Sequence, residues 1–214
     1  FNATIPTSPD NTLFVRDMFN LYQYENFLYT MNLTGKQIKD FLEYSYAGWF
    51  NTMKGPDDHL IYFKTDEKGN IIYDARTNSA QTYTRSYNYD SAAGINYIVD
   101  VSKPAGQRIT ITSLSSGKPF DLSATYSVAI NSYRAQGGGG HLTNGAGISQ
   151  ADLISYKYVT SSTIKDLRYY LMKWFENYKG VVKPFVFNNW SVIPADWVAA
   201  AKQRDMLILY PPSK

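Results

Sequence analysis

The order of strand-like and helix-like segments constrains the fold of this chain most. Alternating apolar residues predict a strand at 27–33, and Thr34 with Gln37 then forms a capping box that opens a helix to about Phe50. Three further strand patterns follow without a helix between them: 96–101, 107–112 and 125–130. Because strands and helices do not alternate regularly, we expect an α+β fold with mixed or antiparallel sheets and flanking helices.

A second helical pattern occurs late in the chain. Ser162 or Thr163 is a suitable N-cap, and Thr163 with Asp166 makes a second capping box ahead of an apolar stripe. Residues 51–82 are polar and irregular, and turn residues within them predict a hairpin between 60–63 and 71–73. The tail, 188–214, mixes Trp, Pro and a short Ala-rich stretch. Among these segments, only the late helix is predicted clearly.

Composition sets the class of protein. With 214 residues, 44% hydrophobic and 18% charged, the chain is long enough to bury a core and reads as one domain over 1–214. The net charge of +3 is small and dispersed, which argues against a nucleic-acid polymer or an anionic membrane as partner. The chain has no cysteine, which excludes disulfides, thiolate nucleophiles and cysteine–zinc sites. No apolar run is long enough to predict a membrane span.

The residues that hydrolytic chemistry needs are scarce. The two histidines are His59 and His141, and His59 follows Asp57 and Asp58, a pattern that fits a solvated acidic loop better than a metal site. The glycines 137–140 are followed by histidine rather than by the Lys-Ser/Thr of a phosphate-binding loop. They either let backbone amides approach a ligand and adopt positive φ, or form a flexible turn. We therefore predict no catalytic residue and no metal ligand in this chain.

Ligand binding has better support. Nineteen tyrosines raise the aromatic fraction to 16%. Segments 22–26 and 131–134 each place a tyrosine beside hydrogen-bonding side chains near a predicted strand end. Two facing tyrosines can sandwich a nucleobase, and such stacking is worth about 1–3 kcal/mol per base. Each tyrosine taken alone is better explained as structural, because its ring also fills half-buried sheet surface.

An ordered set of short motifs resembles a known family. The motifs lie at 24–26, 33–38, 87–90, 93–100, 117–119, 126–131 and 133–138. In this order they resemble the 5′-nucleotidase C-terminal domain, and the stretch from residue 87 looks like its bacterial 2′,3′-cyclic-nucleotide 2′-phosphodiesterase/3′-nucleotidase branch. No single motif is specific, but the likeness runs from about residue 1 to about residue 190 in unchanged order.

The resemblance implies a nucleotide site. In that family the C-terminal domain clamps the base between two aromatic rings, which implies that Tyr24 and Tyr133 are the stacking pair. The other substrate-binding residues that it implies are Asn26, Asn88, Asp90, Gly137, Gly138 and Gly139. Asn26 would bond the base edge or ribose, the glycines would lie along the ribose, and Asn88 with Asp90 would contact the nucleoside.

The resemblance also implies partners. An N-terminal metallophosphoesterase domain, absent from this chain, would bind two divalent metals and hydrolyse the phosphoester of a nucleotide. The present domain would then hold no cofactor and be inactive alone, as part of a hydrolase in the periplasm or otherwise exported. A different class of function stays open, in which the chain is a stand-alone nucleoside- or glycan-binding module without catalysis.

Two departures from the family pattern bear on specificity. An acid that 5′-nucleotidases commonly carry in the glycine loop corresponds here to Gly139, and the region 1–5 lacks an arginine found there. Both departures favour the cyclic-phosphodiesterase branch over 5′-monophosphate specificity. Arg134 either supplies a compensating charge or faces solvent, and we expect it to face solvent.

Overall fold

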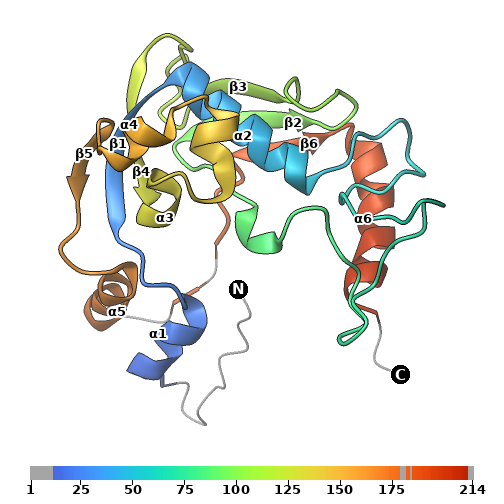
Figure 1. Cartoon of the computed structure of the whole chain (residues 1–214), viewed down its shortest axis with the longest axis horizontal. Coiled ribbons are helices and arrows are strands. Elements are labelled where there is room, and N and C mark those ends of the chain that lie inside the picture. The colour runs from blue at the N-terminus through green and yellow to red at the C-terminus, as the bar shows by residue number, and fades with distance from the viewer. Residues whose placement is uncertain (1–11, 179–181, 184, 212–214) are drawn as a thin grey trace. The chain divides into compact units, whose positions relative to one another are not determined.

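The chain is folded into two compact units, each built from three segments of sequence. The computed structural model describes residues 12–178, 182–183 and 185–211 (Figure 1). Unit 1 comprises 1–33, 126–138 and 149–186. Unit 2 comprises 34–125, 139–148 and 187–214. Each unit has its own three-stranded sheet, and helices and strands do not alternate regularly, so the predicted α+β class is confirmed.

Unit 1 carries a small sheet with short helices. Its elements are α1 (Val15–Leu21), β1 (Leu28–Thr34), β4 (Thr125–Asn131), α3 (Ser132–Ala135), α4 (Gln150–Ile154), β5 (Val159–Ser162) and α5 (Leu167–Asn177). The strand order is β4-β1-β5, and β5 runs antiparallel to β1 with Tyr29 opposite Ser162. Met31 and Leu33 of β1 are buried, as their shared parity predicts for a strand with one inward face. Helix α1 packs on α5.

Unit 2 is built around a mixed sheet. Its elements are α2 (Gly35–Trp49), η1 (Ser86–Asn88), β2 (Ile95–Asp100), β3 (Ile109–Leu114), η3 (His141–Gly145), β6 (Trp190–Ile193) and α6 (Ala195–Leu209). The strand order is β3-β2-β6, with β3 antiparallel and β6 parallel to the central β2. Val99 of β2 lies opposite Ile109 on one side and Val192 on the other. The sheet is therefore mixed, as expected.

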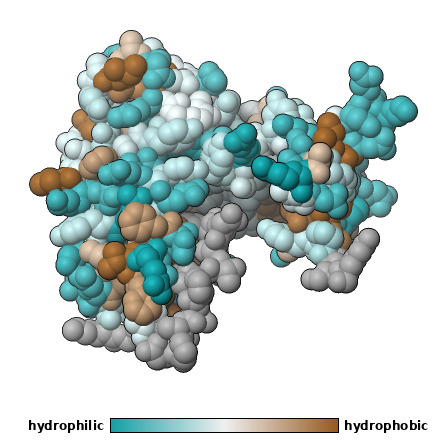
Figure 2. All heavy atoms as spheres, turned by 60° about the horizontal axis from the view of Figure 1, so that its bottom comes forward, coloured by the Kyte–Doolittle hydropathy of each residue, from teal (hydrophilic) through white to brown (hydrophobic). Residues whose placement is uncertain are grey.

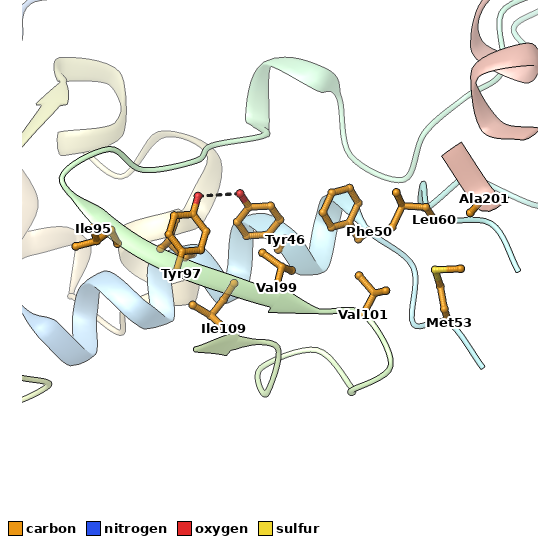
Figure 3. Packing of buried hydrophobic residues seen from close by; sticks show 11 residues of the cluster. Tyr46, Phe50, Met53, Leu60, Ile95, Tyr97, Val99, Val101, Ile109 and Ala201 are labelled. Atoms are coloured by element: carbon orange, nitrogen blue, oxygen red, sulfur yellow. Dashed lines mark hydrogen bonds between the residues drawn. The ribbon is translucent and has the colours of Figure 1, made fainter. Parts of the chain in front are cut away.

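The main hydrophobic core lies in unit 2, between α2 and β2 (Figure 3). Every second residue of β2 is buried, and Ile95, Tyr97 and Val99 face the core. Tyr46 of α2 is fully buried, and its hydroxyl lies 2.9 Å from the hydroxyl of Tyr97 (Figure 3). Burying a large apolar side chain stabilises a fold by about 1.5–3 kcal/mol, so this α2–β2 contact is a main source of stability in the unit.

The predicted strand, cap and helix at the start of the chain are confirmed. The Thr34 hydroxyl accepts a hydrogen bond from the backbone amide of Gln37 at 3.2 Å, and the Gln37 side chain accepts one from the amide of Thr34 at 2.9 Å. This reciprocal pairing satisfies two amides that a helix start leaves without helical partners. Helix α2 therefore begins where the capping box places it.

The predicted start of the late helix is wrong. Helix α5 begins at Leu167 and its N-cap is Asp166, whose carboxylate accepts from the amide of Tyr169 at 2.9 Å. Ser162 instead ends β5, and the Thr163 hydroxyl accepts from the amide of Leu28 at 3.1 Å. A hydroxyl engaged at the edge of β1 is not available to cap a helix, so the acid of the predicted box is itself the cap.

Several elements have weak sequence signals and differ from the expectation. The tail forms β6 and α6, for which the sequence pattern predicts no element. Helix α1 and strand β5 were not predicted either. Helix α6 has Pro194 as N-cap and no side-chain cap bond, so the usual start signal is missing. The predicted hairpin pairs Thr65 with Ile71 in an isolated bridge, not 60–63 with 71–73 in two strands.

The surface is mixed in polarity. On the face drawn in Figure 2, apolar side chains form separate patches among hydrophilic ones. Within the described parts of the chain, every helix is too short or too polar to cross a lipid bilayer.

Candidate functional site

The two segments that carry the expected stacking residues are joined in unit 1. The amide of Phe27 donates to the Ser132 hydroxyl at 3.0 Å, and the amide of Ser132 donates to the Phe27 carbonyl at 2.8 Å. This pair of bonds holds the end of segment 22–26 against the start of α3. Tyr24 and Tyr133 lie close in sequence to the junction, and their side chains are 49% and 44% exposed. Both rings therefore belong to joined segments and are about half exposed.

Asn26 is half-buried beside this junction. Its side-chain amide donates to the Tyr22 hydroxyl at 2.9 Å, and its backbone carbonyl accepts from the amide of Leu167 at the start of α5. Asn26 thus connects the first aromatic segment to α5. Its expected bond to a base or ribose stays a prediction.

The glycine loop has a defined shape. Gly137, Gly139 and Gly140 have φ of 92°, 74° and 80°, in the left-handed region that favours glycine. Gly138 is required for another reason, because a Cβ there would lie 2.5 Å from the Tyr133 ring. Of the two readings left open for these glycines, the positive φ angles support the shaped loop. The close approach of Gly138 also means that loop and ring are positioned together.

Arg134 is buried, so the expectation that it faces solvent is wrong. Its side chain is 3% exposed, and Nη1 donates to the Gly138 carbonyl at 3.0 Å. Its guanidinium carbon lies 5.3 Å from the centroid of the Tyr133 ring, within range of a cation–π contact. A carbonyl in a tight glycine turn lies outside the strand and helix ladders, and a guanidinium can supply its donor. Arg134 therefore supports the loop and the ring at once.

Asn88 and Asp90 lie in unit 2, on the segment around η1. The Ser45 hydroxyl of α2 both accepts from the amide of Asp90, at 2.8 Å, and donates to its carbonyl, at 2.7 Å. Between them, Tyr89 stacks on Trp49 with ring centroids 5.1 Å apart. Burial raises the pKa of Tyr89, and a hydrogen bond with Thr82 opposes this in part. The segment is thus anchored to α2 by its backbone and by one ring.

His141 is a residue of this region that the sequence did not single out. It is 2% exposed, and its ring lies 4.8 Å from Phe41 and 5.2 Å from Tyr44, centroid to centroid. Its Nε2 donates to the carbonyl of Asn88 at 3.0 Å and lies 3.8 Å from a carboxylate oxygen of Asp90. The one available signal was its position directly after four glycines. His141 therefore fixes the segment of Asn88 and Asp90 relative to the end of the glycine loop.

The predicted site residues are thus distributed over both units. Unit 1 contains Tyr24, Asn26, Tyr133, Gly137 and Gly138. Unit 2 contains Asn88, Asp90 and Gly139. Within unit 1 the structure brings the two aromatic segments and the first two loop glycines together, and within unit 2 it brings Asn88 and Asp90 to His141.

His59 has a structural partner. Its Nδ1 lies 2.5 Å from a carboxylate oxygen of Asp205, which is buried on α6. The other carboxylate oxygen of Asp205 accepts from the amides of Leu60 and Ile61 at 2.8 and 2.9 Å. His59 therefore ties its loop to α6. Over the described ranges, no group of three or more His, Asp or Glu side chains is placed to hold a metal ion.

The chain is similar to known proteins over most of its length. Residues 1–144 match the family model described as 5′-nucleotidase, C-terminal domain. The trifunctional nucleotide phosphoesterase protein YfkN of Bacillus subtilis is 35% identical over a region covering 87% of this chain and 12% of that protein. The 2′,3′-cyclic-nucleotide 2′-phosphodiesterase/3′-nucleotidase of Salmonella typhimurium is 30% identical, with 84% of this chain and 26% of that protein covered. The chain therefore spans between about an eighth and a quarter of the length of these relatives.

A solved structure shares the fold. A candidate 5′-nucleotidase from Staphylococcus aureus, crystallised with α-ketoglutarate, superposes with a TM-score of 0.59 at 22% identity. The match covers 85% of this chain and 30% of that one. At this identity the comparison supports the α+β fold alone.

Proposed function

Because the chain belongs to the 5′-nucleotidase C-terminal domain family, as its ordered motifs predicted, we propose that it is the nucleotide-recognition domain of a nucleotide phosphoester hydrolase. One observation carries the proposal. Two exposed tyrosines, Tyr24 and Tyr133, lie in segments that Phe27 and Ser132 join by two hydrogen bonds. Two exposed rings in joined segments support the proposal, because a clamp on a flat base needs one aromatic ring on each face.

The base stacks between the two rings in this proposal. Tyr133 is the better positioned of the pair, because Gly138 packs against its ring and the Arg134 guanidinium lies over it. A ring that is already fixed loses little conformational entropy when a ligand binds, which favours affinity. Asn26, Gly137 and Gly138, which lie in the same unit as the two rings, supply polar groups for the ligand.

Hydrolysis belongs to another part of the protein. We propose a covalently linked N-terminal metallophosphoesterase domain with two divalent metals, which would activate the attacking water and neutralise the phosphate. The described residues do not form a metal site, and the relatives are four to eight times longer than the region they share with this chain. The role of this chain is then to bind and orient the nucleotide, and we derive no hydrolytic step from its residues.

The phosphate specificity that we propose is the cyclic or 3′ type. Gly139 stands where an acid would bind the ribose hydroxyls in 5′-nucleotidases, and its φ of 74° suits glycine far better than aspartate or glutamate. The relative from Salmonella typhimurium carries this activity in its name. A loop without that carboxylate leaves room for a phosphate on the ribose hydroxyls and does not repel it.

The test is calorimetric titration of this chain with adenosine 3′-monophosphate. Tyr24→Ala and Tyr133→Ala should each weaken binding about 5- to 150-fold, the equivalent of one lost stacking contact. Tyr24→Phe and Tyr133→Phe keep the ring and should bind like the wild type. Tyr73→Ala removes a similarly exposed tyrosine of unit 2 and is the control. A wild-type chain that binds no nucleotide at millimolar concentration would refute the proposal.

A further inference from the structure

Tyr156 has a backbone conformation that its side chain disfavours. Helix α4 ends at Ile154, Ser155 is its C-cap, and Tyr156 follows with φ of 57°. Helices often end with one left-handed residue at this position, and glycine is the usual choice because a Cβ is unfavourable there. The amide of Tyr156 donates to the Leu153 carbonyl at 3.1 Å, as the turn requires. The turn explains the angle, but it does not explain the choice of tyrosine.

Burial of the ring does not explain it either. The side chain of Tyr156 is 48% exposed, and its ring touches Tyr29 of β1 with centroids 6.0 Å apart. Its hydroxyl, in contrast, accepts a hydrogen bond from the side-chain amide of Gln136 at 3.2 Å. The Tyr29 side chain also forms hydrogen bonds with Tyr156 and with Gln136. Burial, together with the bond to Tyr156, raises the pKa of Tyr29. The polar tip of Tyr156 is thus the part with defined partners.

Gln136 is the residue that connects α3 to the glycine loop. It caps the C-terminus of α3 and directly precedes Gly137. Its backbone carbonyl accepts from the side chain of Gln150, on α4, at 2.9 Å. The same Gln150 side chain occupies the space that a Cβ on Gly137 would need. Gln136, the residue just before the loop, is therefore held through its side chain by Tyr156 and through its carbonyl by Gln150 of α4.

Gln136 lies only a few residues from the proposed stacking ring and from the glycine that packs on it. Tyr133 is three residues before Gln136, and Gly138, which packs on the Tyr133 ring, is two residues after it. Arg134 holds the Gly138 carbonyl on the other side of this turn. A change at Gln136 therefore moves the surface against which Tyr133 rests.

We propose that Tyr156 is a positioning residue for nucleotide recognition. Through its hydroxyl it holds Gln136, and with Gln136 the start of the glycine loop and the ring of Tyr133, without touching the ligand. This inference rests on the proposed nucleotide-binding function. It also accounts for the backbone of Tyr156, because a glycine would suit the turn better but could not reach Gln136.

Two substitutions separate this role from a merely structural one. Tyr156→Phe removes only the hydroxyl, and Tyr156→Gly removes the side chain while relieving the left-handed backbone. Each should weaken adenosine 3′-monophosphate binding about 2- to 10-fold, the equivalent of one hydrogen bond. Tyr156→Gly should nevertheless melt at or above the wild-type temperature, because glycine is favoured at this φ. Lower affinity without lower stability is not what a structural role predicts.

Coupling and controls complete the experiment. Gln136→Leu removes the donor, and the double variant with Tyr156→Phe should lose less affinity than the sum of the two single losses, because both changes break the same Gln136–Tyr156 bond. Tyr158→Phe, in the same turn, is the matched control and should leave affinity unchanged. In amide NMR spectra without ligand, Gly137 and Gly138 should shift in Tyr156→Phe and not in Tyr158→Phe.

The outcomes are distinct. Wild-type affinity in both Tyr156 variants, alongside weak binding in Tyr133→Ala, would overturn the role of Tyr156 and leave the nucleotide site in place. Additive losses in the Gln136→Leu double variant would overturn the path through Gln136. Absence of nucleotide binding in the wild type would overturn both this inference and the function on which it rests.

Discussion

The Glu43 carboxylate binds the backbone of Arg108, and these two buried residues join α2 to the start of β3. The amide of Arg108 donates to Glu43 Oε2 at 3.0 Å, and the amide of Ile109 donates to Oε1 at 2.7 Å. The Arg108 guanidinium donates to the carbonyl of Phe50 at 2.8 Å, at the C-terminus of α2. The two side chains are 5% and 2% exposed. The Glu43 carboxylate is stabilised by the two backbone amides, and the Arg108 cation is stabilised by the carbonyls at the C-terminus of α2. The opposite charges of the two side chains also attract each other.

Removing the cation of this pair should be costly. Arg108→Met leaves the Glu43 carboxylate buried without its counter-charge, and we expect a loss of about 3–5 kcal/mol in the free energy of unfolding. Urea denaturation followed by circular dichroism measures it. Arg85→Met changes an exposed arginine and should stay within about 0.5 kcal/mol of the wild type. The double variant Glu43→Gln/Arg108→Met should lose less than the sum of its single changes, and an additive loss would contradict the pairing.

The stability of unit 2 should fall at high pH because of Tyr46 and Tyr97. Burial raises the pKa of both hydroxyls, so the folded state keeps these protons at a pH where the unfolded chain, with a pKa near about 10, releases them. Their contribution is therefore complete below about pH 10 and is lost as the pH rises further. Tyr97→Phe should reduce the decline above about pH 10 by up to about 1.4 kcal/mol per pH unit. Urea midpoints at pH 8 and pH 11 test this, with Tyr83→Phe, an exposed tyrosine, as control. Equal decline in wild type and Tyr97→Phe would be inconsistent with the buried pair.

The glycine loop should not tolerate a methyl group at Gly138. An alanine Cβ there would lie 2.5 Å from both the ring and the carbonyl of Tyr133, so Gly138→Ala must displace the ring or the loop. We expect a loss of stability of about 1–3 kcal/mol, as for overpacking, together with weaker nucleotide binding. Gly55→Ala is the matched control, because no atom lies within 4 Å of its Cβ position. Thermal melting and calorimetry measure the two effects, and unchanged binding in Gly138→Ala would show that the ring does not depend on this glycine.

Helix α5 should depend on Asp166 as its cap. Asp166→Ala removes the acceptor for the Tyr169 amide and should cost about 0.5–2 kcal/mol. Asp166→Asn keeps an equivalent cap and should retain most of the stability. Chemical denaturation of the three proteins compares them directly. If the alanine and asparagine variants are equally destabilised, the loss comes from the Asp166 ion pair with Arg168 rather than from the cap.

Local patterns were sufficient for part of the fold. The strand before Thr34, the capping box and α2 were predictable because each depends on residues within one strand or one helical turn. The strands β2, β3 and β4 were located to within two residues for the same reason. Elements with weak local signals were not found: β5 and β6 are four residues long, and α6 begins after Pro194 without a side-chain cap.

The candidate site was also predictable from the sequence only in part. The motifs of Tyr24 and Tyr133 could be recognised, because a family likeness depends on residue order alone. The supporting residues could not be recognised, since nothing local distinguishes a buried arginine from a solvated one. Arg134 was expected in solvent, yet it is buried and donates to the Gly138 carbonyl. His141 had no assigned role, yet it donates to the carbonyl of Asn88.

The sequence by itself therefore determined the α+β class, the strand–cap–helix start and the family, and it predicted the residues of the proposed clamp. Tertiary structure alone decided where Arg134 and His141 lie, and that α5 starts at Leu167 rather than after Thr163. The physical reason is the source of each hydrogen-bond partner. The Thr163 hydroxyl accepts from the amide of Leu28, 135 residues away, and His141 bonds a carbonyl 53 residues away. A backbone donor or acceptor that distant becomes available only when the sheets have formed, and no local pattern encodes it.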